Sequence, residues 1–169
     1  MASFPIWIRV TSANPFPQRY LFVYIVMASA ECAPMAKVGG LGDFVHGLAR
    51  ELVQAEHRVE VLLPKYDCLV LDAVEGLRKA YSDLWVPFYE KGYLCDLYQG
   101  QVDGLDYWFI DPHSPQEFFN RGVIHGEPDD VDRFTLYARA LMEFLYRSGR
   151  HPDVIHCHGW MTALAPLYI

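Results

Sequence analysis

The fold of this chain is constrained most by three consecutive segments. They are a continuous apolar segment, a glycine-rich turn and an amphipathic segment. The apolar run is Tyr20–Ser29 (YLFVYIVMAS), the turn is Ala30–Asp43 (AECAPMAKVGGLGD), and the amphipathic run is Phe44–Glu56. Short continuous apolar runs are typical of strands that are buried on both faces of a parallel sheet. The order predicts a strand, a turn and a helix, with N-terminal amides that can meet phosphate.

The helix is expected over Asp43–Glu56, with Asp43 as its N-cap. Its apolar residues recur with helical periodicity and are expected on one buried face: Phe44, Val45, Leu48, Ala49, Leu52 and Val53. The segment His57–Leu63 (HRVEVLL) then predicts a second strand, which Pro64 ends. A strand, helix and strand in this order predict a parallel pair joined by a right-handed crossover.

The middle of the chain predicts a different arrangement. Three short aromatic-rich segments indicate strands joined by hairpin turns: Leu84–Tyr89, Tyr93–Val102 and Leu105–Ile110. Residues 111–131 are rich in Pro, Asp, Gly and His, and predict a long loop of a kind that often carries function. The fold class is therefore α/β, with a Rossmann-like parallel sheet, helices on both faces and an aromatic-rich hairpin insertion.

The last third of the chain predicts one more helix and one more strand. The helix is expected over Val131–Ser148 and is closed by Gly149. Its buried side is expected to comprise Phe134, Tyr137, Leu141, Phe144 and Leu145. The strand is expected over Asp153–Cys157, and Met161–Ile169 predicts the beginning of a further helix.

Composition limits the function classes. The chain has 169 residues, of which 52% are hydrophobic, and a formal net charge of -7. This charge disfavours nucleic acid and anionic membrane as partners, because both favour a basic surface. No C-x-x-C pair occurs, so four reduced thiols are expected: Cys32, Cys68, Cys95 and Cys157.

The N-terminal region has the outline of a signal peptide, because arginines precede an apolar run and Ala28–Ala30 is small. A buried strand is favoured, because a turn and a helix follow at once. Residues 1–19 are expected to be a leader or linker, and no fold is assigned to them. No apolar run reaches the roughly 18 residues that a membrane span needs.

Spacing alone leaves the role of the glycine-rich turn open. Gly40 and Gly42 supply the first two glycines of the dinucleotide fingerprint, but Val45 stands at the third position. The Walker A pattern is absent as well. Phosphate binding and a merely flexible loop remain equal alternatives. His156 and His158 share a strand face, but no third ligand has convincing spacing, so no metal is predicted.

Five motifs in order nevertheless resemble one enzyme family, the glycogen and starch synthases. The sequence K-x-G-G-L-x-D at Lys37–Asp43 is similar to the N-terminal signature of these ADP-glucose-dependent glucan synthases. The other four motifs are Ser29–Pro34, Leu63–Asp67 (LPKYD), Asp129–Phe134 (DDVDRF) and Pro152–Trp160 (PDVIHCHGW). LPKYDCL and KVGGLGD are closest to the plant-type starch synthase III/IV group and its bacterial relatives.

The resemblance implies a GT-B fold, in which two Rossmann-like domains face each other across a cleft. Residues 20–169 would be a partial N-terminal, acceptor-side domain, and the C-terminal donor domain would be absent. The implied reaction transfers glucose from ADP-glucose to the non-reducing end of an α-1,4-glucan with retention, without a metal or other cofactor. Its partners would be ADP-glucose and a glycogen or starch acceptor. The location would be the bacterial cytoplasm, or alternatively a plastid.

The resemblance also assigns roles to residues of the turn and of the last strand. Lys37 would contact the donor phosphates, and Gly39 and Gly40 would let the backbone approach the sugar nucleotide. Asp43 would be an acidic catalytic group near the reacting sugar, in addition to its expected capping role. His158 would hydrogen-bond the donor glucose in the catalytic cleft.

Two further positions carry weaker assignments. Asp132 would line the cleft as an acidic catalytic residue, or else cap its helix. Trp160 would either pack under the loop, which is favoured, or offer a stacking face to a sugar. The family's H-D-W is His158-Gly159-Trp160 here, so the family aspartate is replaced by glycine.

Three alternatives to the glucan synthase remain open at this point. The first is a GT-B glycosyltransferase with another sugar-nucleotide donor. The second is a non-catalytic glucan-binding or regulatory remnant, which the glycine at position 159 and the expected absence of the donor domain keep open. The third is an NAD-binding domain, which the missing third glycine disfavours.

Overall fold

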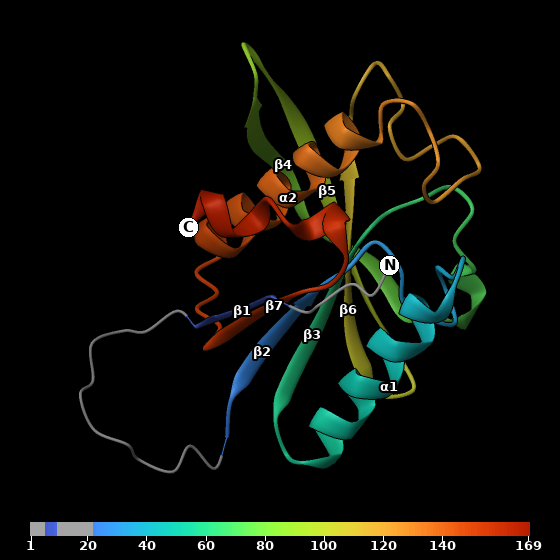
Figure 1. The fold of residues 1–169 in the computed structure, drawn as a ribbon, viewed down its shortest axis with the longest axis vertical. Coiled ribbons are helices and arrows are strands. Elements are labelled where there is room, and N and C mark those ends of the chain that lie inside the picture. The colour runs from blue at the N-terminus through green and yellow to red at the C-terminus, as the bar shows by residue number, and fades with distance from the viewer. Residues whose placement is uncertain (1–5, 10–21) are drawn as a thin grey trace.

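The computed structural model describes residues 6–9 and 22–169 of the chain (Figure 1). The described residues form one seven-stranded sheet in the order β1-β7-β2-β3-β6-β5-β4. The strands are β1 Ile6–Arg9, β2 Tyr24–Ala28, β3 Arg58–Pro64, β4 Glu75–Phe88, β5 Lys91–Val102, β6 Leu105–Pro112 and β7 Val154–Cys157. The helices are α1 Gly40–Gln54 and α2 Asp130–Arg147, with 3-10 turns η1 Leu71–Ala73, η2 Trp160–Thr162 and η3 Ala165–Tyr168.

The centre of the sheet is parallel, as predicted. β2 lies between β7 and β3 and is parallel to both, and β3 is in turn parallel to β6. All five residues of β2 are buried, which confirms a central strand in the apolar run at the N-terminal side of the turn. The carboxyl ends of these four strands meet at one edge of the sheet, where open α/β folds bind their ligands.

The two long helices cover opposite faces of the sheet, which confirms that part of the predicted fold. Neighbouring residues of a strand point to opposite faces. On β6, the Tyr107 hydroxyl lies 3.3 Å from Nδ1 of His46 in α1. The Trp108 ring instead lies 4.8 Å, centroid to centroid, from the Phe144 ring of α2.

The hairpin is confirmed, although it is longer than the sequence predicts. Asp103 and Gly104 join β5 to β6 with φ angles of 51° and 76°, which the tight hairpin turn requires. β4 begins at Glu75, nine residues before the predicted start, and forms an edge of the sheet. Pro87 lies inside β4, and an edge strand can accommodate a proline because one side of its backbone has no partner.

The prediction for the buried face of α1 is wrong at two positions. Phe44 is 52% exposed and Val53 is 38% exposed. The helix begins at Gly40 and directs only a narrow stripe at the sheet, in which Gly42, Val45 and Ala49 are buried. In α2, by contrast, all five residues predicted to be buried are buried, and Gly149 follows its end with a φ of 68°.

Two segments near the chain ends differ from the sequence expectation. Ile6–Arg9, within the region to which no fold was assigned, pairs with β7 as an antiparallel strand. The rest of the expected leader, apart from those four residues, lies outside the described residues. The expected helix after Met161 is replaced by η2 and η3. None of the helices in the described ranges has the length and apolarity that crossing a membrane requires.

Two glycines with opposite surroundings test the packing of this fold. A Cβ added at Gly100 would lie 2.3 Å from Cγ1 of Val74 and 3.1 Å from the Glu75 carbonyl oxygen. We expect Gly100→Ala to lower the free energy of unfolding by about 1–3 kcal/mol, because backbone and core must both shift. Urea denaturation monitored by circular dichroism measures this change.

Gly47 provides the matched control for that substitution. It lies inside α1, and an added Cβ would meet nothing within 4 Å. We expect Gly47→Ala to raise the free energy of unfolding by about 0.5–1 kcal/mol, because alanine restricts the unfolded chain. Equal effects of the two substitutions would contradict the described packing around β5.

Candidate functional site

The glycine-rich turn folds back onto the first turn of α1. The Cys32 amide donates to the Ala36 carbonyl oxygen at 2.8 Å, and the Ala36 amide donates to the Cys32 carbonyl oxygen at 3.0 Å. The Ala33 amide also donates to the Gly42 carbonyl oxygen at 3.0 Å. The first two bonds close the turn on itself and the third pairs it with the helix that follows, so the turn has a defined shape at the carboxyl end of β2.

The prediction that Asp43 is the N-cap of α1 is wrong. The N-cap is Gly39, and no side chain accepts a hydrogen bond in the manner of an N-cap. The Glu31 carboxylate instead accepts from the amides just before the helix, at 2.7 Å from Val38 and 2.9 Å from Gly39. Because Glu31 satisfies these donors, the helix can begin three residues before Asp43.

Asp43 lies in the first turn of α1 and forms an ion pair with Lys37. The distance from Lys37 Nζ to Asp43 Oδ2 is 2.8 Å, and both side chains are about half exposed, at 49% and 58%. Exposed pairs of this kind contribute about 0–1 kcal/mol. The structure thus brings two predicted site residues together and leaves both accessible.

Gly39 and Gly40 lie at the N-terminal end of α1. A Cβ added at either residue would meet nothing within 4 Å, so the described protein atoms leave open space there. Gly42, by contrast, is buried, and a Cβ there would lie 3.2 Å from the Ala36 carbonyl oxygen. The first two glycines therefore leave room beside the backbone, whereas the third allows the turn to pack on the helix.

His158 follows β7 and lies beside the same helix end. Its amide donates to the Ala28 carbonyl oxygen at 2.9 Å, which ties it to the end of β2. Its ring contacts the Phe44 ring edge-on at 5.9 Å and lies 3.9 Å from the His156 ring, centroid to centroid. Within the described part of the chain, its buried Nε2 has no hydrogen-bond partner.

Burial keeps both histidines uncharged near neutral pH. Removal from water, together with the smaller effect of the neighbouring His156, lowers the pKa of His158 to about 3. Burial likewise lowers the pKa of His156 to about 4. A neutral imidazole at position 158 can donate or accept one hydrogen bond at Nε2 without the cost of burying a charge. Among the described residues, no three His, Cys, Asp or Glu side chains converge as a metal site requires.

Gly159, at the position where the family resemblance implies an aspartate, has a backbone that favours glycine. Its φ and ψ are 76° and 170°, in a region that side-chain-bearing residues almost never adopt. A Cβ at this position would be 3.4 Å from Cδ2 of Leu41 in α1, which is ordinary contact. The strain of a replacement would thus arise from the backbone angle rather than from crowding.

Asp132 and Trp160 lie near the start of α2. The Tyr89 hydroxyl, at the tip of the β4–β5 hairpin, donates to Asp132 Oδ1 at 2.6 Å. Asp132 does not cap α2, whose N-cap is Asp129. The Trp160 ring touches the Phe134 ring edge-on at 5.6 Å, and 55% of the residue is exposed. No hydrogen bond or ion pair among the described residues joins Asp132 to Lys37, Asp43 or His158.

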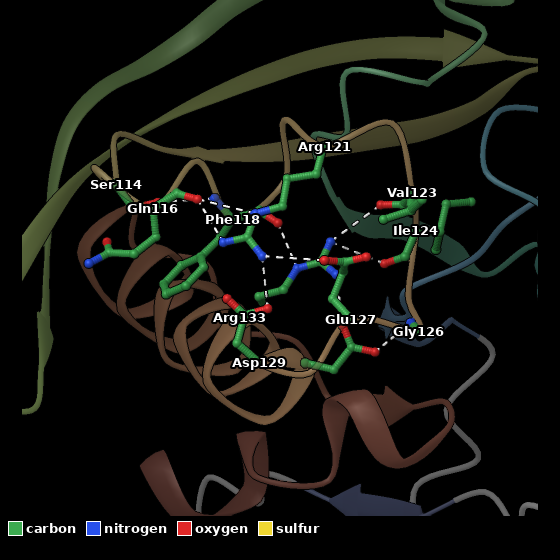
Figure 2. A network of polar contacts seen from close by, with 11 residues as sticks. Ser114, Gln116, Phe118, Arg121, Val123, Ile124, Gly126, Glu127, Asp129 and Arg133 are labelled. Atoms are coloured by element: carbon green, nitrogen blue, oxygen red, sulfur yellow. Dashed lines mark hydrogen bonds and ion pairs between the residues drawn. The ribbon is translucent and has the colours of Figure 1, made fainter.

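The sequence analysis did not identify the residues that hold the long loop between β6 and α2. Arg133 is fully buried and donates to the carbonyl oxygens of Phe118, Val123 and Ile124 and to the Asp130 carboxylate, at 2.6–3.4 Å (Figure 2). A second arginine, Arg121, binds the Asp129 carboxylate and the Gln116 carbonyl oxygen. The arginine in DDVDRF was the available signal, because a buried guanidinium must find several acceptors.

The LPKYD motif has a supporting role in the same region. The Tyr66 hydroxyl donates to the carbonyl oxygen of Ala30, the first residue of the glycine-rich turn, at 3.1 Å. The Asp67 carboxylate accepts from the Gly122 amide at 2.9 Å. The motif thus holds the turn and the long loop on either side of one short segment.

A cavity of about 420 Å³ lies elsewhere, between the C-terminal half of α2 and the last residues of the chain. Its walls include Met142, Tyr146, Arg150, Ile155 and Tyr168. None of the predicted site residues lines it, so the cavity and the glycine-rich turn are separate features.

The two buried histidines predict a pH dependence of stability. In the unfolded chain a histidine binds a proton near pH 6.5, whereas in the folded chain His158 and His156 bind one only near pH 3 and pH 4. Below pH 6.5 the unfolded state therefore binds more protons, and stability falls as pH falls. We expect each histidine to remove up to about 1.4 kcal/mol per pH unit between pH 6 and pH 4.

Urea unfolding of the wild type and of His158→Gln at several pH values checks this dependence. The variant should show a shallower loss of stability on acidification. The exposed His151 supplies the control, His151→Gln, which should retain the wild-type slope. An unchanged slope in His158→Gln would contradict the assignment of His158 as a buried neutral group.

Restoring the family aspartate tests the backbone at position 159. We expect Gly159→Asp to lower the free energy of unfolding by about 1–3 kcal/mol, because a residue with a Cβ adopts this positive φ and extended ψ only at a cost. Gly159→Ala should cost a similar amount, since it carries the Cβ without the carboxylate. Thermal unfolding measures both variants, and a stabilised Gly159→Asp would show that the carboxylate provides a cap after all.

Comparison with known proteins agrees with this geometry. Residues 24–169 match the family described as the starch synthase catalytic domain. The chain is 52% identical over 139 residues to Glycogen synthase 2 of Methylococcus capsulatus, covering 82% of this chain and 28% of that protein. It is 48% identical over 147 residues to Glycogen synthase 1 of Nitrosococcus oceani, covering 87% and 30%.

A solved structure matches equally well. The catalytic domain of Starch Synthase IV from Arabidopsis thaliana, bound to ADP and acarbose, has a TM-score of 0.84 and 48% identity. The match covers 86% of this chain and 30% of that one. This chain therefore spans less than a third of the length of these relatives, and its sheet is that of a GT-B starch synthase. The chain belongs to the starch synthase catalytic domain family.

Proposed function

We propose that this chain is part of an enzyme that transfers glucose from ADP-glucose to the non-reducing end of an α-1,4-glucan, with retention. The observation that carries the proposal is the placement of Lys37, the open glycines and His158 around one end of α1. This arrangement occurs in a chain that is 48% identical to a starch synthase bound to ADP and acarbose. ADP supports a nucleotide-sugar donor, and acarbose supports a glucan-like acceptor.

Lys37 and the first turn of α1 would hold the donor diphosphate. As the bond between glucose C1 and the phosphate oxygen breaks, ADP leaves with an additional negative charge. A lysine and helix N-terminal amides stabilise charge that develops at this place. The pair between Lys37 and Asp43 is exposed and therefore weak, so a diphosphate can compete for the lysine.

The open space beside Gly39 and Gly40 would accept the sugar nucleotide close to the backbone. No described atom lies within 4 Å of a Cβ at either residue, so a ligand rather than the protein explains why both are glycine. Asp43 would then lie next to the donor, where its carboxylate serves the catalytic role that the family resemblance implies.

His158 would hydrogen-bond the donor glucose through Nε2. This nitrogen is buried and lacks a protein partner among the described residues, and a buried polar atom without a partner costs free energy. A sugar hydroxyl would satisfy it. Asp132, which Tyr89 orients in the first turn of α2, would contact the sugars, and so would Trp160 of η2, with half of its surface exposed.

The relatives and the thiols support a proposal for the compartment. All four cysteines are free, as in a reducing environment. The relatives include bacterial glycogen synthases and a probable starch synthase 4 of Arabidopsis thaliana described as chloroplastic/amyloplastic. We therefore place the enzyme in the bacterial cytoplasm or in a plastid.

A chimaera tests the proposal. Residues 22–169 replace the matching segment of Glycogen synthase 2 from Methylococcus capsulatus, and incorporation of labelled glucose from ADP-glucose into glycogen is measured. We expect the chimaera to be active and the 169-residue chain alone to be inactive, because it spans only 28% of that relative. Incorporation by the chain alone would contradict the proposal that it is one part of the active enzyme.

Within the chimaera, Lys37→Ala should impair use of the donor. We expect kcat/KM for ADP-glucose to fall about 100-fold, a typical effect of removing one electrostatic contact to a developing charge. The thermal midpoint should hardly change, because the exposed pair with Asp43 contributes little. Lys65→Ala would be the wrong control, because Lys65 forms a largely buried ion pair with Asp111. Lys91→Ala is suitable, because Lys91 is exposed at the start of β5.

The same experiment separates the alternatives. Turnover with another sugar nucleotide but not with ADP-glucose would favour a different donor. Glycogen binding without turnover by any donor would favour a non-catalytic glucan-binding remnant, which Gly159 in place of the family aspartate makes worth testing.

A further inference from the structure

The Glu31 carboxylate is a buried charge at the point where two functional loops meet. Its side chain is 5% exposed. Oε2 accepts from the Val38 and Gly39 amides at 2.7 and 2.9 Å, and Oε1 lies 3.3 Å from Nε2 of His125. In the described ranges no lysine or arginine pairs with it. Since a buried carboxylate is costly without partners, these contacts are what holds it in place.

The two hydrogen bonds from backbone amides to Glu31 determine which amides at the start of α1 remain available to a ligand. Val38 and Gly39 directly precede α1, and their amides are committed to Glu31. No described side chain or loop carbonyl oxygen accepts from Gly40 or Leu41, the first two residues of α1. Amides in the first helical turn have no acceptor within the helix. An anion at this end would therefore use Gly40 and Leu41, not the residues before them.

The contact with His125 connects the glycine-rich turn to the long loop between β6 and α2. His125 follows Val123 and Ile124, whose carbonyl oxygens accept from the fully buried Arg133 (Figure 2). The next residue, Gly126, donates its amide to the Asp130 carboxylate at 2.6 Å. His125 thus lies in a segment that hydrogen bonds fix on both sides. Through His125, Glu31 connects the glycine-rich turn to this fixed part of the long loop.

We propose that Glu31 is a positioning residue, which fixes the glycine-rich turn so that Lys37 and the amides of Gly40 and Leu41 face the donor diphosphate. The hydrogen bonds from the Val38 and Gly39 amides to Glu31 align the backbone segment between Lys37 and Gly40. The His125 contact sets the distance between this backbone and the long loop. Glu31 itself touches neither donor nor acceptor. The proposal rests on the glucosyl transfer proposed above.

Two substitutions separate the hydrogen bonds of Glu31 from its charge. Glu31→Gln keeps a side-chain oxygen that can accept from both amides, and its amide nitrogen can donate to an unprotonated Nε2 of His125. Glu31→Ala removes every contact. In the chimaera we expect Glu31→Ala to raise the KM for ADP-glucose about tenfold or more, as loss of charge-assisted bonds implies. Glu31→Gln should stay within about twofold of the wild type, and the KM for glycogen should change in neither variant.

A purely structural role predicts a different result. Partial unfolding lowers the amount of active enzyme, so it reduces the maximal rate and leaves both KM values unchanged. Glu51→Ala, on the exposed side of α1, is the matched control and should behave as the wild type. A wild-type KM for ADP-glucose in Glu31→Ala would overturn the proposal, and so would a Glu31→Gln variant as impaired as Glu31→Ala.

Amide hydrogen exchange of the 169-residue chain distinguishes failure of this proposal from failure of the proposed function. By NMR we expect the Val38 and Gly39 amides to exchange about tenfold faster or more in Glu31→Ala than in the wild type. If the wild-type chimaera transfers no glucose, the proposed function fails. Faster exchange then still shows that Glu31 fixes the turn, whereas unchanged exchange shows that it does not, and the positioning proposal fails as well.

Discussion

The loop beside the candidate site depends on the hydrogen bonds of one buried guanidinium, that of Arg133. The segment between β6 and α2 has no helix or strand of its own, and its carbonyl oxygens must find donors away from water. Arg133 supplies these donors from the first turn of α2, and its guanidinium also lies over the rings of Phe119 and Phe134, at 5.4 and 5.6 Å from their centroids. The loop is therefore attached to the helix that follows it, and it can act as a fixed wall.

The central architecture was predictable because it follows from local periodicity. The apolar run before the turn, the amphipathic stripe of α2 and the Asp103–Gly104 hairpin each depend on residues close in sequence, and each was confirmed. The start of α1 was not predictable in the same way. The Glu31 carboxylate accepts from the Val38 and Gly39 amides just before the helix, so the rule that favours Asp43 as a cap did not apply. β1 and residues 75–83 of β4, at the two edges of the sheet, were also missed, because pairing rather than propensity determines them.

In the candidate site, too, the features that depend on local sequence were predictable and those that depend on distant residues were not. Motif order brought Lys37, Asp43 and His158 together in the prediction, and the structure places them around one end of α1. The partner of Asp132 could not be found from the sequence, because Tyr89 lies 43 residues away on a hairpin whose tip position depends on the whole sheet. Glu31 was visible inside the Ser29–Pro34 motif, yet only the fold shows that its carboxylate faces backbone amides rather than a ligand.

The geometry at Gly159 shows how this chain holds His158 without the aspartate that the family resemblance implies at position 159. An aspartate at a helix start contributes by accepting a hydrogen bond from a backbone amide, which needs a backbone that directs the side chain at that amide. Here the chain turns with a φ of 76° and continues into a short 3-10 turn, so that geometry is absent. The Thr162 hydroxyl donates to the carbonyl oxygens of His158 and Gly159 instead, at 3.0 and 3.2 Å. The turn that holds His158 is thus fixed from its far end, and the position of the imidazole does not depend on a carboxylate at position 159.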